Sequence, residues 1–425
     1  MSGLALYRGL TTIAEPLVRF YLGRRVRRGK EDPQRMAERR GIASAPRPDG
    51  PLIWLHAASV GEAQSALALI ERLLAMRPDV NLLVTSGTVT SAGMLSKRLP
   101  ERAIHQFVPV DVGRWVKRFL DHWRPDLALF LESELWPNLL LETAARGCPL
   151  ILVNGRLSAR SFGRWRKAPG IVRPLMQSFA LCLGQTDGDR ERFAALGAPR
   201  CEYLGNLKYS AEPLPADEGA LAAMRKAIGK RPVWLAASTH PGEEELAATV
   251  HKALKESYPD LLTIIVPRHP NRGDEIAAML EEGLSVRRRG KDQLPDADCE
   301  IYLADTLGEL GLFYRLAEIA FIGGSTGSLG GHNPLEAAQL GCAVIHGPDM
   351  SNFRTIAADL AAAESAMSFE NESGLIMAVA RLLEDHDKRK RLAKAARKVS
   401  IENSDAVDRI AGALTPFVEA LPGGR

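Results

Sequence analysis

The stretch FIGGSTGSLGGHNPLEAAQLG, residues 321–341, decides how the chain is expected to fold. The apolar run at 319–322 is typical of a buried strand, and a loop with five glycines between positions 323 and 331 follows it. Asn333, Pro334 and Glu336 then suit the N-cap, first and third positions of a helix. This order of strand, glycine loop and helix start predicts an anion-binding site. Free amides of the loop would face the anion, and the helix dipole would favour its negative charge. A tight turn between strand and helix is the alternative interpretation.

Strand-like and helix-like segments alternate on both sides of this stretch. In the first half the apolar runs lie at 52–56, 81–85, 104–108, 127–131, 150–154 and 201–207. In the second half they lie at 233–237, 262–266, 301–304, 319–322 and 343–346. Such alternation predicts an α/β protein with two parallel sheets, each covered on both faces. The segment SAEPLPADEG, 210–219, is the expected connector between two domains.

The composition limits the classes of function. A length of 425 residues favours two domains, and the formal net charge is only +4. Residues 1–41 hold ten Lys/Arg and four Asp/Glu, so the rest of the chain is slightly acidic and nucleic acid is not an expected partner. The five cysteines form no CxxC motif or Cys/His cluster, so neither a metal site nor a disulfide framework is expected.

The first residues combine an apolar stripe with a basic cluster. At helical spacing the stripe holds Leu6, Leu10, Ile13, Leu17 and Phe20/Tyr21, and four arginines and a lysine follow between 24 and 30. Charged residues and Pro16 interrupt the run, so it is a poor candidate for a membrane-spanning helix. An amphipathic helix lying on an anionic membrane surface is the preferred interpretation. A helix packed on the protein's own core is the alternative.

Polar residues follow several strands of the second half. Ser238, His240 and Glu243 follow one strand, and Arg268 with His269 follows the next. The carboxyl ends of parallel strands share one edge of the sheet, so these groups are expected to surround a nucleotide-bearing ligand there. For His240 and Glu243, capping of the following helix is an equally favoured interpretation. GxxxxGK[ST] and a GxGxxG after the first strand are both missing, which disfavours a P-loop ATPase and an NAD enzyme.

The first half offers a carboxylate at the end of its first strand. Ser59 and Glu62 have the spacing of a capping box, so Glu62 is either a cap or a general base for an attacking hydroxyl. Lys208, near the domain junction, is a cation that can offset negative charge on a ligand. A basic segment, 160–167, suits a phosphorylated amphiphile, with a solvated charged surface as the alternative.

Six motifs in order resemble the 3-deoxy-D-manno-octulosonic acid (Kdo) transferases of Gram-negative bacteria. They are SVGE at 59–62, ESELWPN at 132–138, NGRLSARS at 154–161, GNLK at 205–208, PRHP at 267–270, and GGS with GGHNPLE within 323–336. The resemblance implies a GT-B glycosyltransferase with two Rossmann-like domains facing each other across a cleft. It implies a membrane-associated N-terminal helix within 1–41, an acceptor domain at 42–209 and a donor domain at 210–425.

The resemblance also implies the reaction. Kdo would pass from CMP-Kdo to a lipid A precursor at the cytoplasmic face of the inner membrane, with inversion and without a metal or other cofactor. Glu62 would be the base, and Glu132 and Lys208 would stabilise the transition state. The acceptor would contact Ser59, Gly61, Arg156 and Arg160. CMP would be held by Ser238, His240, Arg268, His269, Leu307, Gly308, Glu309, Gly324, Ser325, Asn333, Pro334, Leu335 and Glu336.

Two other functions are compatible with the same residues. One is another GT-B enzyme that uses a UDP-sugar, either a transferase or an epimerase. The other is a lipid-binding surface protein without catalytic activity, in which the glycine loop is only structural.

Overall fold

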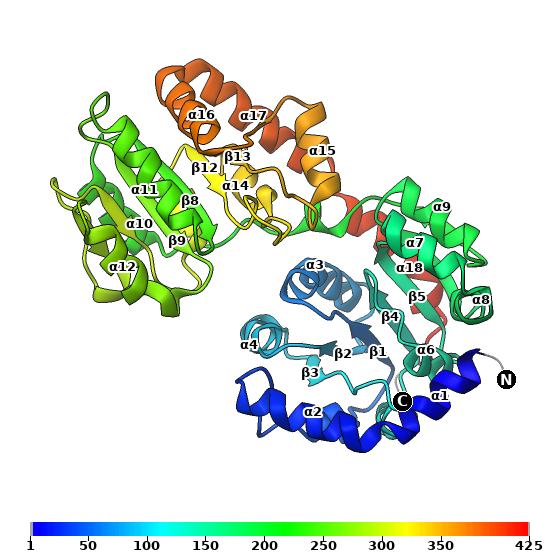
Figure 1. Cartoon of the computed structure of the whole chain (residues 1–425). Helices are drawn as coiled ribbons and strands as arrows, with labels where there is room; N and C mark the ends of the chain where they lie inside the picture. The colour runs from blue at the N-terminus through cyan, green and yellow to red at the C-terminus, as the bar shows by residue number, and fades with distance from the viewer. Residues whose placement is uncertain (1–2, 424–425) are drawn as a thin grey trace. The chain divides into compact units, whose positions relative to one another are not determined.

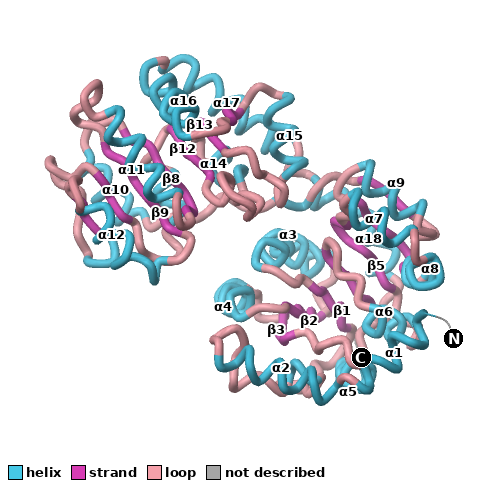
Figure 2. The backbone as a smooth tube through the Cα atoms, in the orientation of Figure 1, coloured by secondary structure: helices cyan, strands magenta, loops and turns pink. Residues whose placement is uncertain are grey.

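A computed structural model of the chain describes residues 3–423, which form two compact units. Unit 1 comprises Met1–Ala211 and Asn403–Arg425, and unit 2 comprises Glu212–Glu402. Each unit is built on a seven-stranded sheet in which every neighbouring pair of strands is parallel (Figure 1). Figure 2 shows the strands of both sheets in magenta with helices around them.

The sheet of unit 1 has the strand order β3-β2-β1-β4-β5-β6-β7. Its strands are β1 (Leu52–His56), β2 (Asn81–Ser86), β3 (Ala103–Phe107), β4 (Leu127–Leu131), β5 (Leu150–Gly155), β6 (Phe179–Gly184) and β7 (Cys201–Tyr203). The helices are α1 (Gly3–Ile13), α2 (Glu15–Arg27), α3 (Val60–Met76), α4 (Val89–Arg98), α5 (Gly113–Trp123), α6 (Pro137–Ala144), α7 (Ala159–Arg166), α8 (Pro169–Gln177), α9 (Asp187–Ala195) and α18 (Ala406–Glu419).

Alternate residues of these strands face opposite sides of the sheet and so build two cores. Ile53 and Leu55 of β1 belong to a cluster that includes side chains of α3, α4 and α18. Leu52 and Trp54 belong to a second cluster with side chains of α5, α6, α8 and α9. The near-continuous apolar strands are therefore explained by burial on both faces.

The sheet of unit 2 has the strand order β10-β11-β9-β8-β12-β13-β14. Its strands are β8 (Val233–Thr239), β9 (Leu262–Pro267), β10 (Val286–Arg288), β11 (Ile301–Leu303), β12 (Ile319–Ile322), β13 (Ala343–His346) and β14 (Ala366–Ser368). The helices are α10 (Glu218–Ile228), α11 (Glu243–Leu254), α12 (Gly273–Glu281), α13 (Leu310–Tyr314), α14 (Pro334–Gln339), α15 (Arg354–Ala362), α16 (Glu372–Glu384) and α17 (His386–Glu402). Side chains of α11, α12 and α16 share one core cluster with the strands.

The C-terminal helix does not pack where the predicted division at 210–425 places it. Helix α18 belongs to unit 1, because its stripe of Ile410, Leu414 and Val418 is buried in the same cluster as α3. The Arg77 side chain also donates hydrogen bonds to the carbonyls of Val418 and Leu421, at 2.8 and 2.9 Å. A helical apolar stripe predicts burial but does not say which sheet covers it.

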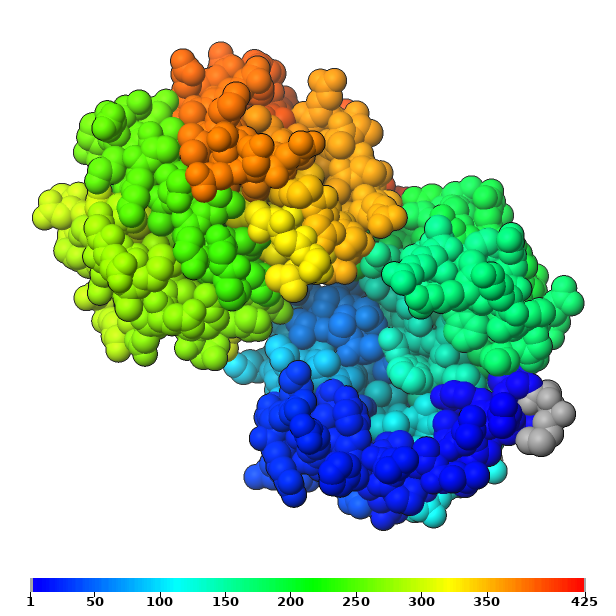
Figure 3. Space-filling model, viewed as in Figure 1, coloured from blue at the N-terminus to red at the C-terminus, as the bar shows by residue number. Residues whose placement is uncertain are grey.

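The N-terminal helices attach to unit 1 by polar contacts and by a small apolar cluster, in which Leu22 is buried with Val112 and Trp115. The Tyr7 hydroxyl donates to Asp111 at 2.8 Å, and Arg8 and Glu15 form ion pairs with Glu142 and Arg114. The apolar stripe faces away from the protein: Leu6, Leu10, Ile13, Leu17, Phe20 and Tyr21 are 53% to 78% exposed. The space-filling view shows this N-terminal segment, in blue, on the outside of unit 1 (Figure 3). Packing of the stripe on the protein's own core, the alternative from the sequence, is therefore wrong for these residues.

Among residues 3–423, none of the helices combines the length and the apolar composition that crossing a membrane requires.

Candidate active site

In unit 1, several charged side chains lie where the strands end. Helix α3 begins just after β1 and carries Glu62 in its first turn. Glu132 and Glu134 follow β4, the neighbour of β1 in the sheet. Lys208 lies in a short 3-10 helix, Leu207–Ser210, after β7. The sheet order thus gathers groups that are far apart in the sequence.

The carboxylate of Glu62 is held by the start of its own helix. The Ser59 hydroxyl donates to one oxygen and the Ala58 amide to the other, each at 2.8 Å. The Ser59 oxygen also accepts from the Glu62 amide at 3.3 Å, so Ser59 is the N-cap. Burial, followed by the charge of Glu132, raises the pKa of Glu62 to about 7, although the Ser59 and Ala58 hydrogen bonds oppose this. Glu62 is therefore both a cap and a carboxylate poised to exchange a proton near neutral pH.

Glu132 and Lys208 form an ion pair inside unit 1. The Lys208 Nζ lies 2.8 Å from Glu132 Oε1, and the two side chains are only 9% and 13% exposed. Glu132 has a φ of +55°, in the left-handed region, which places its side chain outside the regular strand direction. The Asn206 side chain accepts a hydrogen bond from the Lys208 amide at 3.0 Å, which fixes the turn that carries the lysine.

Glu134 has a different partner. His56 Nε2 lies 3.6 Å from Glu134, and the Trp136 indole donates to the same carboxylate. Burial alone would raise the pKa of Glu134, but the nearby His56 ring and the hydrogen bond from Trp136 lower it overall. The Nδ1 of His56 lies 2.9 Å from the Thr85 hydroxyl, so the ring is held from both sides.

The residues predicted to contact an acceptor are distributed over three elements. Ser59 and Gly61 lie at the start of α3, and Arg160 is exposed on α7. Arg156 follows β5, and its amide donates to the Glu132 carbonyl at 3.2 Å. The backbone of Arg156 is thereby fixed beside the Glu132 turn.

In unit 2, three histidines and an arginine meet at the strand ends. His240 Nε2 and His332 Nε2 are 3.0 Å apart with nearly parallel rings, and the His240 and His269 ring centroids are 5.7 Å apart. Burial, then the charge of Arg268, lowers the pKa of His332 to about 4. A side chain at Gly324 would lie 3.1 Å from His332, so glycine permits this close approach. Burial also lowers the pKa of His240, so both rings favour the neutral form and only one Nε2 of the pair carries the shared proton.

Three consecutive amides of the glycine loop are not free, which corrects the prediction from the sequence. Glu243, the first residue of α11, extends its carboxylate into the loop and accepts from the amides of Gly324, Ser325 and Thr326 at 2.7 to 3.2 Å. The His240 amide donates to the same carboxylate at 3.0 Å. The protein thus supplies its own anion to this loop, and the conformation of the loop depends on Glu243.

Other predicted donor residues already have internal partners. Glu309 pairs with Arg289, whose Nη2 lies 2.6 Å away, and the Ser325 hydroxyl donates to the Ile322 carbonyl at 2.5 Å. Leu307 is 81% exposed beside Gly308, whose φ is +85°.

The predicted helix start after His332 is confirmed. Asn333 is the N-cap of α14, and its side-chain oxygen accepts from the Leu335 amide at 3.1 Å. Its side-chain nitrogen lies 3.5 Å from Glu336 Oε1. Pro334 and Leu335 are buried, so in this group the polar atoms at the surface belong to Asn333 and Glu336. Ser238 precedes His240 with a φ of +58°.

Comparison with known proteins identifies the family. The model of the family described as 3-deoxy-D-manno-octulosonic-acid transferase (kdotransferase) matches residues 34–211. The 3-deoxy-D-manno-octulosonic acid transferase of Rickettsia bellii is 38% identical over 387 residues, which is 91% of this chain and 92% of the relative. The chain belongs to the Kdo transferase family. The corresponding protein of Haemophilus influenzae is 34% identical over 97% of this chain and 98% of its own length.

This Kdo transferase is therefore a glycosyltransferase that transfers Kdo in lipopolysaccharide biosynthesis. Its family decides against the two alternative functions considered from the sequence. A solved structure, the UDP-GlcNAc 2-epimerase from Neisseria meningitidis bound to UDP-GlcNAc, covers 86% of this chain and 100% of its own, with a TM-score of 0.61 and 14% identity. At that identity the likeness shows the fold alone, two parallel-sheet α/β domains resembling GT-B glycosyltransferases.

Three residues of the Kdo transferase site are missing from the residues predicted from the sequence: His56 and Glu134 in the unit 1 site and His332 in the unit 2 site. Glu243 was expected beside a ligand or as a helix cap, and the structure shows that it organises the glycine loop. His332 lies within a motif that was recognised, and Glu243 opens a helix where a capping role was expected. Neither position reveals its partner, because the contacts join segments about 80 to 90 residues apart in the chain.

Proposed function

We propose that this Kdo transferase takes Kdo from CMP-Kdo and attaches it to a hydroxyl of a lipid A precursor. The observation that carries the proposal is the Glu62 carboxylate, whose pKa is raised to about 7 beside the Glu132–Lys208 ion pair. A base with a pKa near the working pH is present in its ionised form and still accepts a proton effectively. A hydroxyl group must lose its proton when its oxygen attacks the sugar, so the reaction requires such a base.

The reaction is a single displacement. Glu62 takes the proton of the acceptor hydroxyl as its oxygen forms a bond to the anomeric carbon of Kdo. The bond from that carbon to the CMP phosphate breaks, and the phosphate leaves with the electron pair. Attack opposite the leaving group inverts the anomeric centre, so neither a protein nucleophile nor a metal is part of the scheme. Lys208, positioned by Glu132, offsets negative charge that develops in the transition state.

Unit 2 is the proposed binding site for CMP. Arg268 is half-buried at the end of β9, and its side chain makes no hydrogen bond or ion pair with another residue in 3–423. A guanidinium in this position suits a phosphate bidentately. His240 and His269 extend the donor set, and Asn333 and Glu336 offer an amide and a carboxylate to ribose hydroxyls. Since Glu243 fills the glycine loop, we assign the phosphate to Arg268 and the histidines and not to the amides of residues 324–326.

The proposed location is the cytoplasmic face of the inner membrane. Polar contacts and the buried Leu22 hold α1 and α2 to unit 1, and the apolar stripe is exposed. Arg24, Arg25, Arg27, Arg28 and Lys30 follow the stripe. Exposed apolar side chains next to a basic cluster favour an anionic lipid surface, where the lipid acceptor is also found.

Competition between nucleotides tests the donor assignment. CMP and UMP are titrated into the full chain by calorimetry, together with the variant Arg268→Ala. The proposal expects CMP to bind at least about tenfold more tightly than UMP, and Arg268→Ala to weaken CMP binding by about tenfold or more, as expected for the loss of a charge-assisted pair. Equal affinities for the two nucleotides, or no effect of the substitution, would contradict it.

A further inference from the structure

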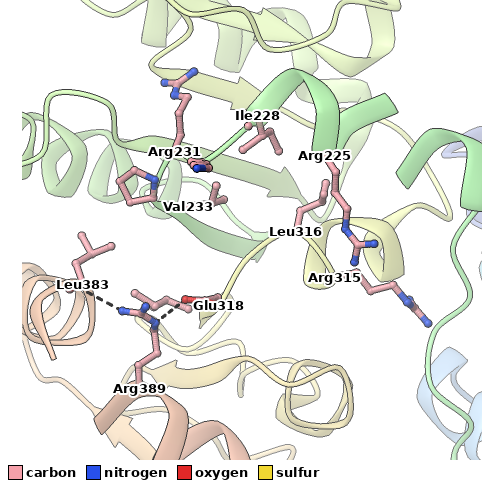
Figure 4. A pocket seen from close by; sticks show the side chains of 13 residues that line it. Arg225, Ile228, Arg231, Val233, Arg315, Leu316, Glu318, Leu383 and Arg389 are labelled. Carbon is pink, nitrogen blue, oxygen red and sulfur yellow. Dashed lines mark hydrogen bonds and ion pairs between the residues drawn. The ribbon is translucent and has the colours of Figure 1, made fainter. Parts of the chain in front are cut away.

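Unit 2 has a cavity away from the proposed donor site. Its volume is about 550 Å³. Val233 and Ile319, the first residues of β8 and β12, line it, so it lies at the amino ends of these strands (Figure 4). The proposed donor residues follow the carboxyl ends, at the opposite edge of the same sheet. The two sites are therefore distinct.

The lining of this cavity is strongly cationic. It contains Arg225, Lys230, Arg231, Arg315 and Arg389 and a single carboxylate, Glu318. The carboxylate is already engaged, because Arg389 Nε lies 2.7 Å from it. The other four cations have no carboxylate partner among residues 3–423. Like charges in one concave site raise the local potential and attract an anion.

Two of these arginines are held by backbone carbonyls. Arg231 donates to the carbonyls of Asp260 and Asp296, each at 2.9 Å, and its remaining nitrogen donates to those of Leu261 and Cys299, so the backbone engages the whole guanidinium. Arg315 donates to the carbonyls of Leu214 and Gly311 at 2.6 and 2.7 Å. Carbonyl oxygens are neutral acceptors, so these bonds fix the side chains and leave their charge uncompensated. Because these arginines are already ordered in the free protein, ligand binding does not have to reduce their conformational entropy.

Arg225 and Lys230 complete the site from the end of α10 and the turn after it. Both are exposed, and neither forms a hydrogen bond or ion pair with another residue in 3–423. Figure 4 shows Arg225 extending from the helix toward Arg315. Ile228 and Leu316 supply apolar surface beside the cations.

We propose that this cavity binds a soluble phosphate ester or diphosphate, separate from the sugar donor. A ligand with two or more negative charges matches four cations that have no carboxylate partner among residues 3–423. Arg225, Lys230 and the nitrogens of Arg315 that no backbone carbonyl engages suit phosphate oxygens, whereas Arg231 contributes its charge. The volume lies within the range of small-molecule sites. The apolar residues accommodate the organic part of an ester. The inference goes beyond Kdo transfer and does not depend on the assignment of its donor or acceptor.

Calorimetry with inorganic pyrophosphate tests this site. The full chain carries Arg268→Ala in every sample, so that binding at the proposed donor site does not contribute. The pocket variant adds Arg225→Glu and Lys230→Glu. The control adds Lys226→Glu, an exposed cation of the same helix that does not line the cavity.

Saturable pyrophosphate binding that falls at least about tenfold in the pocket variant, and changes less than about twofold in the control, supports the site. Absence of saturable binding up to about 10 mM, corresponding to an affinity weaker than about −3 kcal/mol, would overturn the proposal. An equal loss of pyrophosphate affinity in the pocket and control variants would also overturn the proposal. It would show that pyrophosphate responds to the net charge of the surface and not to this cavity. Transfer activity measured without pyrophosphate is expected to be unchanged by Arg225→Glu and Lys230→Glu in the chain with Arg268 intact. Pyrophosphate binding and Kdo transfer are measured separately. A failure of the proposed transfer reaction would therefore not by itself abolish pyrophosphate binding or make the pocket and control variants lose it equally.

Discussion

Glu62→Gln is expected to remove transfer activity and at the same time to stabilise unit 1 at alkaline pH. Burial and the charge of Glu132 raise the pKa of Glu62 from 4.5 to about 7 in the folded protein. Between these values the unfolded chain ionises the carboxyl group more readily than the folded chain does. The unfolded state then binds fewer protons, so this group lowers stability as the pH rises through the window and its full cost is present above about pH 7.

The size of the effect follows from the shift. Each pKa unit corresponds to about 1.4 kcal/mol, so the full cost is about 3 kcal/mol. Under the same linkage relation, about 1.4 kcal/mol of it is present at pH 5.5 and nearly all of it at pH 8. Glutamine cannot ionise, so the stability difference between Glu62→Gln and the wild type should grow by about 2 kcal/mol between these two pH values. Altered hydrogen bonds to Ser59 and Ala58 shift the difference by a similar amount at every pH and leave this growth unchanged.

Urea unfolding followed by tryptophan fluorescence measures this growth. Five of the six tryptophans lie in unit 1, so the signal reports mainly on the unit that contains Glu62. Glu71→Gln, an exposed carboxylate of the same helix, is the matched control and should show little pH-dependent difference. A constant difference between Glu62→Gln and the wild type from pH 5.5 to 8 would refute the argument that Glu62 is held protonated by its surroundings.

Three further substitutions test separate parts of the structure. Glu132→Gln removes the charge that helps to raise the pKa of Glu62, so the acidic limb of kcat/KM against pH should move to lower pH by roughly half a unit or more. His332→Ala removes the 3.0 Å partner of His240 and should raise KM for CMP-Kdo by about tenfold with a smaller change in kcat. Leu17→Glu should weaken binding to phosphatidylglycerol vesicles by about tenfold or more, because it places a charge in the apolar stripe.

Each of these substitutions has an outcome that counts against the reasoning. An acidic limb that stays in place in Glu132→Gln would mean that Glu132 does not act on the base. Unchanged KM in His332→Ala would show that the histidine pair does not position the donor. Leu17 is 72% exposed, so circular dichroism of Leu17→Glu should be unaltered; full vesicle binding by a folded variant would exclude the stripe as the lipid-binding surface.

Much of the two-sheet architecture could be predicted from the sequence because local patterns determine it. The strands at 52–56, 127–131, 319–322 and 343–346 are found where the apolar runs predict them. Strands β10 and β14 were not predicted, since each has only three residues and Val286–Arg288 carries two charges. Strand β6, Phe179–Gly184, was also not predicted, although its sequence is an apolar run. The predicted strand at 201–207 ends at Tyr203, before the 3-10 turn that carries Lys208.

The candidate site was predictable in its residue types but not in its internal contacts. The position of Glu62 after a strand shows that it is near a strand end, whereas its raised pKa depends on its burial in the fold and on Glu132, seventy residues later in the chain. The glycine loop predicts an anion, but the sequence does not show that this anion is the protein's own Glu243. Likewise, the period of the N-terminal stripe does not distinguish a buried face from one that faces away from the protein.

The most direct test of the central claim is the mass of the product formed from CMP-Kdo and a purified lipid A precursor by the full chain at pH 8. The wild type should add the mass of one or more Kdo units, and Glu62→Gln should slow that addition by about a hundredfold or more, as expected for loss of a general base. Failure of the wild type to change the mass of the precursor, or a Glu62→Gln variant that does so at the rate of the wild type, would contradict the proposed mechanism.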